Sequence, residues 1–92
     1  MSLTEELKAV AASVVWFKSP EETLSDRVYF LCYLMRYGLP EDVIIARRYF
    51  TESDFKAALM HAYPGIFDQP SWAYWNLMLF NTPERPMPMR VL

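Results

Sequence analysis

The sequence has 92 residues with 9 basic and 11 acidic side chains, so its formal net charge is -2 at pH 7. A chain of this length forms one domain, and the lack of a basic surplus argues against general binding to phosphate backbones. No apolar run approaches the ~18 residues of a membrane span, and the acidic N-terminus is unlike a secretory signal. A single cysteine excludes an internal disulfide bond. We therefore expect a cytoplasmic protein that does not cross a membrane.

The first apolar stripe predicts a helix over residues 3–17. Ser2 and Glu5 have the spacing of a capping box, in which each side chain accepts a hydrogen bond from the other residue's backbone N–H. Apolar residues then recur at intervals of four, three and four, which is typical of one face of a helix. They are Leu3, Leu7, Val10 and Val14.

The most apolar segment predicts a central helix that ends at Tyr37. Ser19 stands before a proline as an N-cap does, and Ser25 with Asp26 offers a second start, so a short turn can precede the main helix. Gly38 is expected to end the helix in the left-handed conformation. Apolar side chains cover nearly the whole circumference of this segment, which indicates burial on several sides. They are Leu24, Val28, Tyr29, Phe30, Leu31, Tyr33, Leu34, Met35 and Tyr37.

Three further helices are predicted in the second half of the chain. One begins at Leu39, before a proline that suits the first turn, and runs to about Phe50. The next begins at Thr51, and the last is capped by Asp68 or Ser71. Their apolar positions are Val43, Ile45, Ala46, Tyr49, Phe50, Phe55, Ala58, Leu59, Ala62, Trp72, Tyr74, Trp75, Met78 and Leu79.

Together these elements predict an all-α protein. We expect a compact bundle of about five short helices over residues 1–80 and an extended, proline-rich C-terminal tail over residues 81–92. The three prolines of the tail forbid a helix there. Only 2 glycines are present, which is too few for the turns of an all-β sandwich.

Few side chains are suited to enzyme chemistry. His61 and Cys32 are the only histidine and cysteine, whereas a zinc site draws most of its three or four protein ligands from these residue types. Cys32 falls in the central apolar run, where a free cysteine behaves as a small hydrophobe. His61 falls near a predicted helix end, where a cation suits the dipole, and the carboxylates fall mostly at helix starts. The sequence therefore predicts no catalytic residue, no metal, no cofactor and no enzyme activity.

A small helix-turn-helix-like DNA-binding regulator is the alternative that the sequence leaves open. The helices predicted before and after the junction of Phe50 and Thr51 would form such a pair. Arg47 and Arg48 lie on the first helix and Lys56 on the second, and these are the candidate nucleic-acid contacts. The junction lacks the glycine that this motif often has, so nucleic acid is the less favoured partner.

The chain has more aromatic residues than a single small core can readily bury. The chain has 3 Trp, 6 Tyr and 6 Phe, and two predicted helices carry two apolar stripes each, more than one small core needs. One stripe is therefore expected to face another protein, most simply a second copy in a homodimer. Tryptophan and tyrosine also dominate interface hot spots. The candidate partner interface consists of Tyr29, Tyr33, Tyr37, Trp72, Tyr74 and Trp75.

Three short stretches occur in a familiar order. They are residues 37–42, Tyr-Gly-Leu-Pro-Glu-Asp; residues 47–50, Arg-Arg-Tyr-Phe; and residues 64–68, Pro-Gly-Ile-Phe-Asp, leading to Ser-Trp-Ala-Tyr-Trp-Asn at 71–76. Over about residues 24–90 the chain resembles small helical bacterial proteins of unknown function that are encoded beside nucleotidyltransferase-type toxins of abortive-infection systems. In better-known relatives the aromatic segment is closer to Arg-Thr-Ala-Asn-Phe-Trp, so residues 71–76 match it approximately. The resemblance implies a non-enzymatic, antitoxin-like accessory protein that binds such a toxin, and it carries over no catalytic residue.

Overall fold

The protein is all-α in the computed structural model, which describes the backbone of residues 2–88 and the side chains of residues 5–88. The described residues form six helices and no strand. The helices are α1 (Ser2–Val14), α2 (Pro20–Leu24), α3 (Arg27–Tyr37), α4 (Pro40–Ala46), α5 (Glu52–Met60) and α6 (Gln69–Phe80). The all-α prediction is confirmed. The structure has one helix more than the five expected, because the turn before the central helix is a separate helix, α2. No helix in the described part is both long enough and apolar enough to span a membrane.

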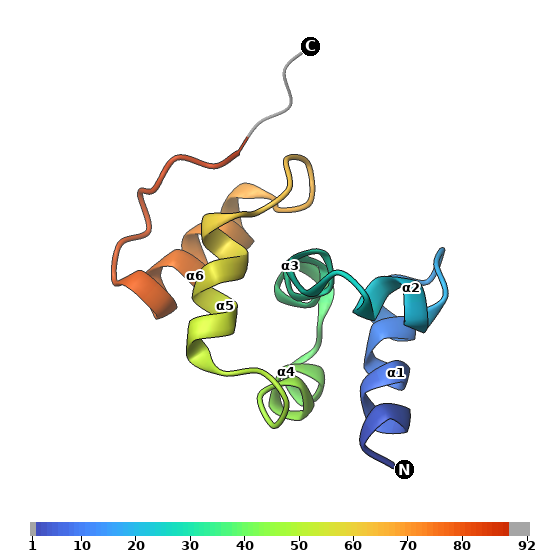
Figure 1. The fold of residues 1–92 in the computed structure, drawn as a ribbon. Coiled ribbons are helices and arrows are strands. Elements are labelled where there is room, and N and C mark those ends of the chain that lie inside the picture. The colour runs from blue at the N-terminus through green and yellow to red at the C-terminus, as the bar shows by residue number, and fades with distance from the viewer. Residues whose placement is uncertain (1, 89–92) are drawn as a thin grey trace.

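Helix α3 lies at the centre of the molecule and packs against most of the other helices. In Figure 1, α5 and α6 lie on one side of α3, and α1 with α2 on the other side, while α4 lies below. The molecule measures 40 × 30 × 19 Å. Its shortest dimension is about two helix diameters, so α3 alone is covered on most sides and every other helix keeps a face toward solvent.

The core is built around α3. Phe30, Leu31 and Leu34 of this helix are completely buried. Helices α1 and α5 pack against it with the described residues of their predicted apolar stripes, and α6 contributes Trp72. The other buried apolar residues are Val10, Ala11, Val14, Val15, Cys32, Met35, Ala46, Phe55, Ala58, Leu59, Ile66 and Phe67.

Side-chain caps start four of the six helices. In each case a side-chain oxygen accepts a hydrogen bond from the backbone N–H three residues later, which satisfies one of the free donors of the first turn. The caps are Ser19 for α2, Asp26 for α3, Thr51 for α5 and Asp68 for α6. Of the two caps expected for the last helix, Asp68 is therefore the one used. The capping box predicted for Ser2 and Glu5 depends on the side chain of Ser2, which lies outside the described residues.

Two helices end earlier than the sequence predicts. Helix α1 stops at Val14, because α2 turns back to pack against it, and the residues after it form a turn. Helix α4 stops at Ala46 rather than continuing to Phe50. The N–H groups of Arg48 and Tyr49 donate to carbonyls three residues back rather than four, which is the tighter geometry of a helix end.

The prediction that Gly38 adopts a left-handed conformation is wrong. Its φ is -67° and its ψ is 143°, so the backbone leaves α3 in an extended conformation, and Leu39 is held extended by the proline that follows it. Gly38 is needed for space: a Cβ there would lie 2.5 Å from the carbonyl oxygen of Leu34 and 2.9 Å from its Cδ1. A left-handed cap does occur after α6, at Asn81, with φ 58° and ψ 31°.

The described part of the predicted tail, residues 81–88, contains no helix and packs along α6. The indole N–H of Trp72 donates to the carbonyl oxygen of Arg85 at 2.7 Å. The Arg85 guanidinium donates to the buried amide oxygen of Asn76 at 3.2 Å and lies 4.5 Å from the centre of the Phe80 ring. The tail therefore completes the hydrogen bonding of two α6 side chains.

We expect Leu31→Ala to lower the free energy of unfolding by about 2–5 kcal/mol, because truncation leaves a cavity at the most enclosed point of a small core. Urea unfolding followed by circular dichroism measures the change. Leu77→Ala, at an exposed position of α6, is the control and should change stability by less than about 0.5 kcal/mol. A similarly small effect at Leu31 would show that α3 is not the centre of the fold.

We expect Gly38→Ala to destabilise the protein by about 1–3 kcal/mol, because the added methyl group overlaps backbone atoms that cannot move independently. The φ of Gly38 is accessible to alanine, so this cost is purely steric. Thermal unfolding compares this variant with Ser53→Ala at an exposed position of α5. Equal midpoints would mean that the corner between α3 and α4 has room for a side chain.

Candidate functional site

Six aromatic rings form a continuous row across one surface of the molecule. Neighbouring ring centres are 4.9–6.4 Å apart. The rings come from the turn between α1 and α2, from α3, and from the loop between α5 and α6. We call this set the aromatic row; its members are Trp16, Phe17, Tyr29, Tyr33, Tyr37 and Tyr63.

The spacing of three tyrosines along α3 creates the middle of the row. Tyr29, Tyr33 and Tyr37 are four residues apart and therefore share one face of the helix, with neighbouring ring centres 4.9 and 5.8 Å apart. Trp16 and Phe17 follow the end of α1 and fold over this face. Their rings meet Tyr37 and Tyr33 at steep angles, 86° and 69°, the edge-to-face arrangement that aromatic pairs favour.

Most of the aromatic row is open to solvent. Trp16 is 71% exposed, Phe17 54%, Tyr37 45% and Tyr63 41%, while the other two tyrosines are half-buried. Contiguous exposed apolar surface of this kind is uncommon on a monomer and marks interaction sites. The three α3 tyrosines were predicted from the sequence as interface residues, whereas the other three rings were not. The available signal was that Trp16 and Phe17 fall outside the apolar stripe of the first helix.

Two cations lie over the row without giving it a strong charge. The Lys18 ammonium is 4.3 Å from the centre of the Tyr29 ring, and the Arg36 guanidinium is 4.4 Å from that of Tyr37. Such cation–π contacts hold ring and cation together. Arg36 is also paired with Asp68 at 3.3 Å, so Lys18 is the more accessible charge.

A hydrogen bond fixes the Tyr63 end of the row. The Tyr63 hydroxyl donates to the carboxylate of Asp26, the same side chain that caps α3. This bond is the main reason that the pKa of Asp26 lies below its ordinary value, and it raises the pKa of Tyr63. Burial raises the pKa of Tyr33. These two tyrosines therefore stay uncharged at neutral pH.

The structure divides the predicted partner interface into separate places. Trp72 is only 2% exposed, with its indole bound to the tail, so its inclusion in that interface is corrected: it is a core residue. Trp75 is half-buried, and its indole N–H donates to the carbonyl oxygen of Met35 at 2.8 Å. Tyr74 is exposed, and its ring lies 5.4 Å from that of Trp75 rather than within the aromatic row.

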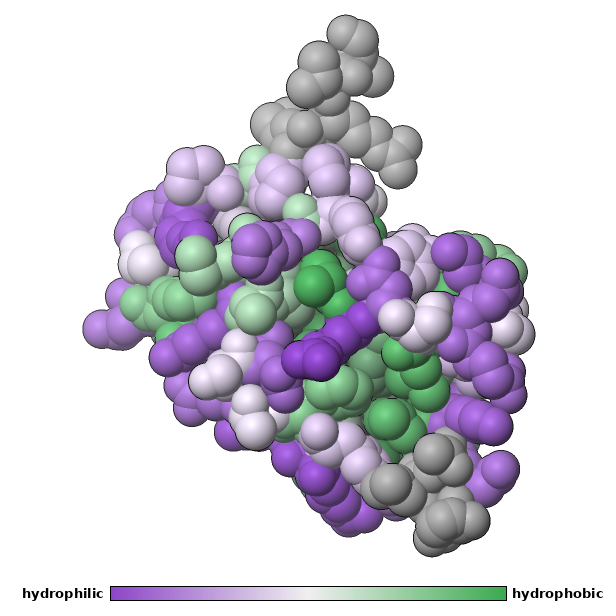
Figure 2. Space-filling view, in the orientation of Figure 1, coloured by the Kyte–Doolittle hydropathy of each residue, from purple (hydrophilic) through white to green (hydrophobic). Residues whose placement is uncertain are grey.

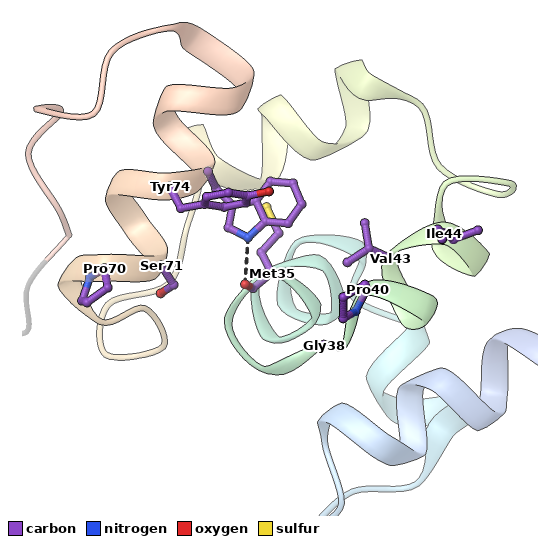
Figure 3. Close-up of a pocket in the computed structure, with 9 residues that line it drawn as sticks. Met35, Gly38, Pro40, Val43, Ile44, Pro70, Ser71 and Tyr74 are labelled. Atoms are coloured by element: carbon purple, nitrogen blue, oxygen red, sulfur yellow. Dashed lines mark hydrogen bonds between the residues drawn. The ribbon is translucent and has the colours of Figure 1, made fainter.

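An apolar groove of about 530 Å³ lies between α4 and α6, with the end of α3 as its floor. Figure 3 shows Pro40, Val43 and Ile44 on the α4 side and the ring of Tyr74 on the α6 side. Figure 2 shows green, apolar surface over the middle of one face of the molecule, interrupted by purple, hydrophilic residues. The full lining is Met35, Gly38, Pro40, Val43, Ile44, Pro70, Ser71, Tyr74 and Trp75.

The candidate nucleic-acid contacts do not form one basic surface. Arg48 pairs with Glu6 at 3.0 Å, and Lys56 pairs with Glu52 at 3.2 Å. Arg47 lies beside a small hollow that also includes Glu52. Helices α4 and α5 do not pack against each other, so they lack the arrangement of a helix-turn-helix pair.

Cys32 and His61, the residue types most often used in catalysis, do not form a reactive site in this structure. The Cys32 thiol is buried and donates to the carbonyl oxygen of Ala58 at 3.6 Å, and burial raises the pKa of Cys32 to about 12. It is therefore a protonated thiol rather than a nucleophile. His61 is exposed at the end of α5. Among the described residues no cluster of His, Cys, Asp or Glu is arranged to hold a metal ion.

Comparison with known proteins adds no relative: no family model, no curated protein and no solved structure matches the chain.

We expect Tyr63→Phe to raise the pKa of Asp26 toward its usual value, because the variant lacks the hydroxyl donor. The lowered pKa means that ionised Asp26 stabilises the fold above about pH 4, and this contribution is lost as the pH falls through the lowered pKa. The variant should therefore lose less stability on acidification than the parent.

An NMR titration of the Asp26 carboxyl group, with unfolding measured at each pH, tests this expectation. Tyr49→Phe is the matched control, because the Tyr49 hydroxyl donates to a different carboxylate, that of Glu6, at 2.9 Å. An Asp26 titration that is the same in both variants and the parent would contradict the role given to Tyr63.

Proposed function

We propose that this chain is a non-enzymatic protein-interaction module that binds its partner on the aromatic row. The observation that carries the proposal is the row itself: six rings in mutual contact, four of them at least 41% exposed. Burial of such rings is a large source of binding energy, and Trp and Tyr are enriched among hot-spot residues.

The fixed geometry of the row favours binding. Edge-to-face contacts hold Trp16 and Phe17, a cation–π contact holds Tyr29, and a hydrogen bond holds Tyr63. Side chains that are already ordered lose little conformational freedom when a partner arrives, so more of the contact energy remains as affinity. Tyrosine hydroxyls along the row add hydrogen-bonding groups at its wet edge.

The partner class follows from the resemblance described above. We propose an antitoxin-like accessory role in which the aromatic row binds a nucleotidyltransferase-type toxin. The apolar rings require an apolar segment on that partner, and the exposed ammonium of Lys18 favours a carboxylate at its edge. The small hydrophobic surface with polar margins suits a complex that forms and dissociates.

Trp16→Ala tests the proposal. The side chain is largely exposed, so its removal should leave the thermal unfolding midpoint nearly unchanged. Loss of the most exposed tryptophan of the interface should weaken binding by about 2 kcal/mol or more, roughly thirty-fold. The measurement is isothermal titration calorimetry with a purified nucleotidyltransferase-type toxin of the proposed partner class.

Met78→Ala on α6 is the control, since Met78 is exposed but is not a member of the aromatic row. It should bind as the parent does. Failure of the parent chain to bind would contradict the toxin partner. Equal affinity of the parent and Trp16→Ala would contradict the aromatic row as the binding surface.

A further inference from the structure

Helix α6 has no polar face. None of its twelve residues, Gln69–Phe80, carries a charge, and apolar side chains surround it. A helix of this kind is normally buried on all sides. Here the core and the tail cover the side that carries Trp72, yet Tyr74 is 54% exposed, Leu77 46% and Met78 60%. Part of α6 therefore lacks the cover that its composition requires.

The uncovered side chains lie next to the apolar groove. Tyr74, Leu77 and Met78 are spaced as i, i+3 and i+4, so they form one stripe on α6. Tyr74 also lines the groove (Figure 3), and Ile44, which is 61% exposed, stands on its α4 side. A projecting stripe and a hollow of the same apolar character are thus neighbours on a single face.

Charge around this face is balanced. Near the start of α6, Arg36 is paired with Asp68. On the other side of Trp75, a small hollow is lined by Arg47 and Glu52, one charge of each sign. This face therefore has no charge to complement a strongly charged partner, but it is complementary to an uncharged apolar surface.

We infer that two copies of this chain associate through this face, with the α6 stripe of each copy seated in the groove of the other. A twofold axis requires one patch that is complementary to itself, and a stripe and a groove that share Tyr74 meet that requirement. The second copy also supplies the uncharged apolar helix that the surroundings of the groove favour.

The dimer should be weak. A standard stable interface buries about 800 Å² and about 20–30 residues on each partner, whereas the groove and stripe together comprise about a dozen. The whole chain exposes 5807 Å². We therefore expect association in the micromolar range, reversible on dilution. The inference does not depend on the proposed function, because the aromatic row lies on different residues.

Sedimentation velocity over a range of micromolar concentrations gives the dissociation constant of the dimer. Met78→Glu places a charge in the stripe and should raise that constant on the order of ten-fold or more. Ile44→Glu, on the opposite wall of the groove, should do the same. Met60→Glu is the matched control: Met60 is 61% exposed on α5 and does not line the groove, so this variant should dimerise as the parent does.

Three results would overturn the inference. One is a parent chain that stays monomeric throughout the range, and another is a Met78→Glu variant that dimerises as well as the parent. The third is loss of the dimer in Trp16→Glu but not in Met78→Glu, which would assign self-association to the aromatic row. Circular dichroism of each variant establishes that it is folded.

Discussion

The structure depends on the burial of one helix. A chain of 92 residues has enough apolar side chains to enclose α3, and the molecule is only 19 Å thick once it has done so. Helices α1, α4, α5 and α6 therefore pack around α3, and each of them has one face at the surface. The side-chain caps and the glycine at position 38 also contribute to the burial of α3. They allow the chain to end one short helix, turn sharply and pack the next helix against α3.

Two surfaces of different chemistry result from this arrangement. The aromatic row combines rings with hydroxyl groups and has cations at its edge. Interfaces between proteins that also exist separately have a similar polar rim. The exposed face of α6 consists of Tyr74, Leu77 and Met78, and no residue of this helix carries a charge. The aromatic row and the exposed face of α6 share no residue, so the two proposed contacts do not compete for side chains.

The features that were predicted correctly from the sequence are those that depend on neighbouring residues in the chain. The caps at Ser19, Thr51 and Asp68 follow from hydrogen bonds within four residues, and the buried stripes follow from helical periodicity. Other features depend on how the elements pack. The chain turns from α3 toward α4 through an extended Gly38, where the local signal predicted a left-handed cap. Trp72 is core rather than interface because the tail, thirteen residues later, bonds to it. The place of Trp16 over Tyr37 depends on how α1 meets α3, and periodicity cannot reveal this.

The contact between Trp72 and Arg85 has a consequence for synthesis of the protein. Helix α6 precedes Arg85 in the chain, so it is synthesised before its partner in the tail. Until Arg85 has left the ribosome, the Trp72 indole N–H and the Asn76 amide oxygen lack this hydrogen-bond partner. The helices around α3 are then free to assemble, but closure of the α6 side waits until the segment that contains Arg85 has followed.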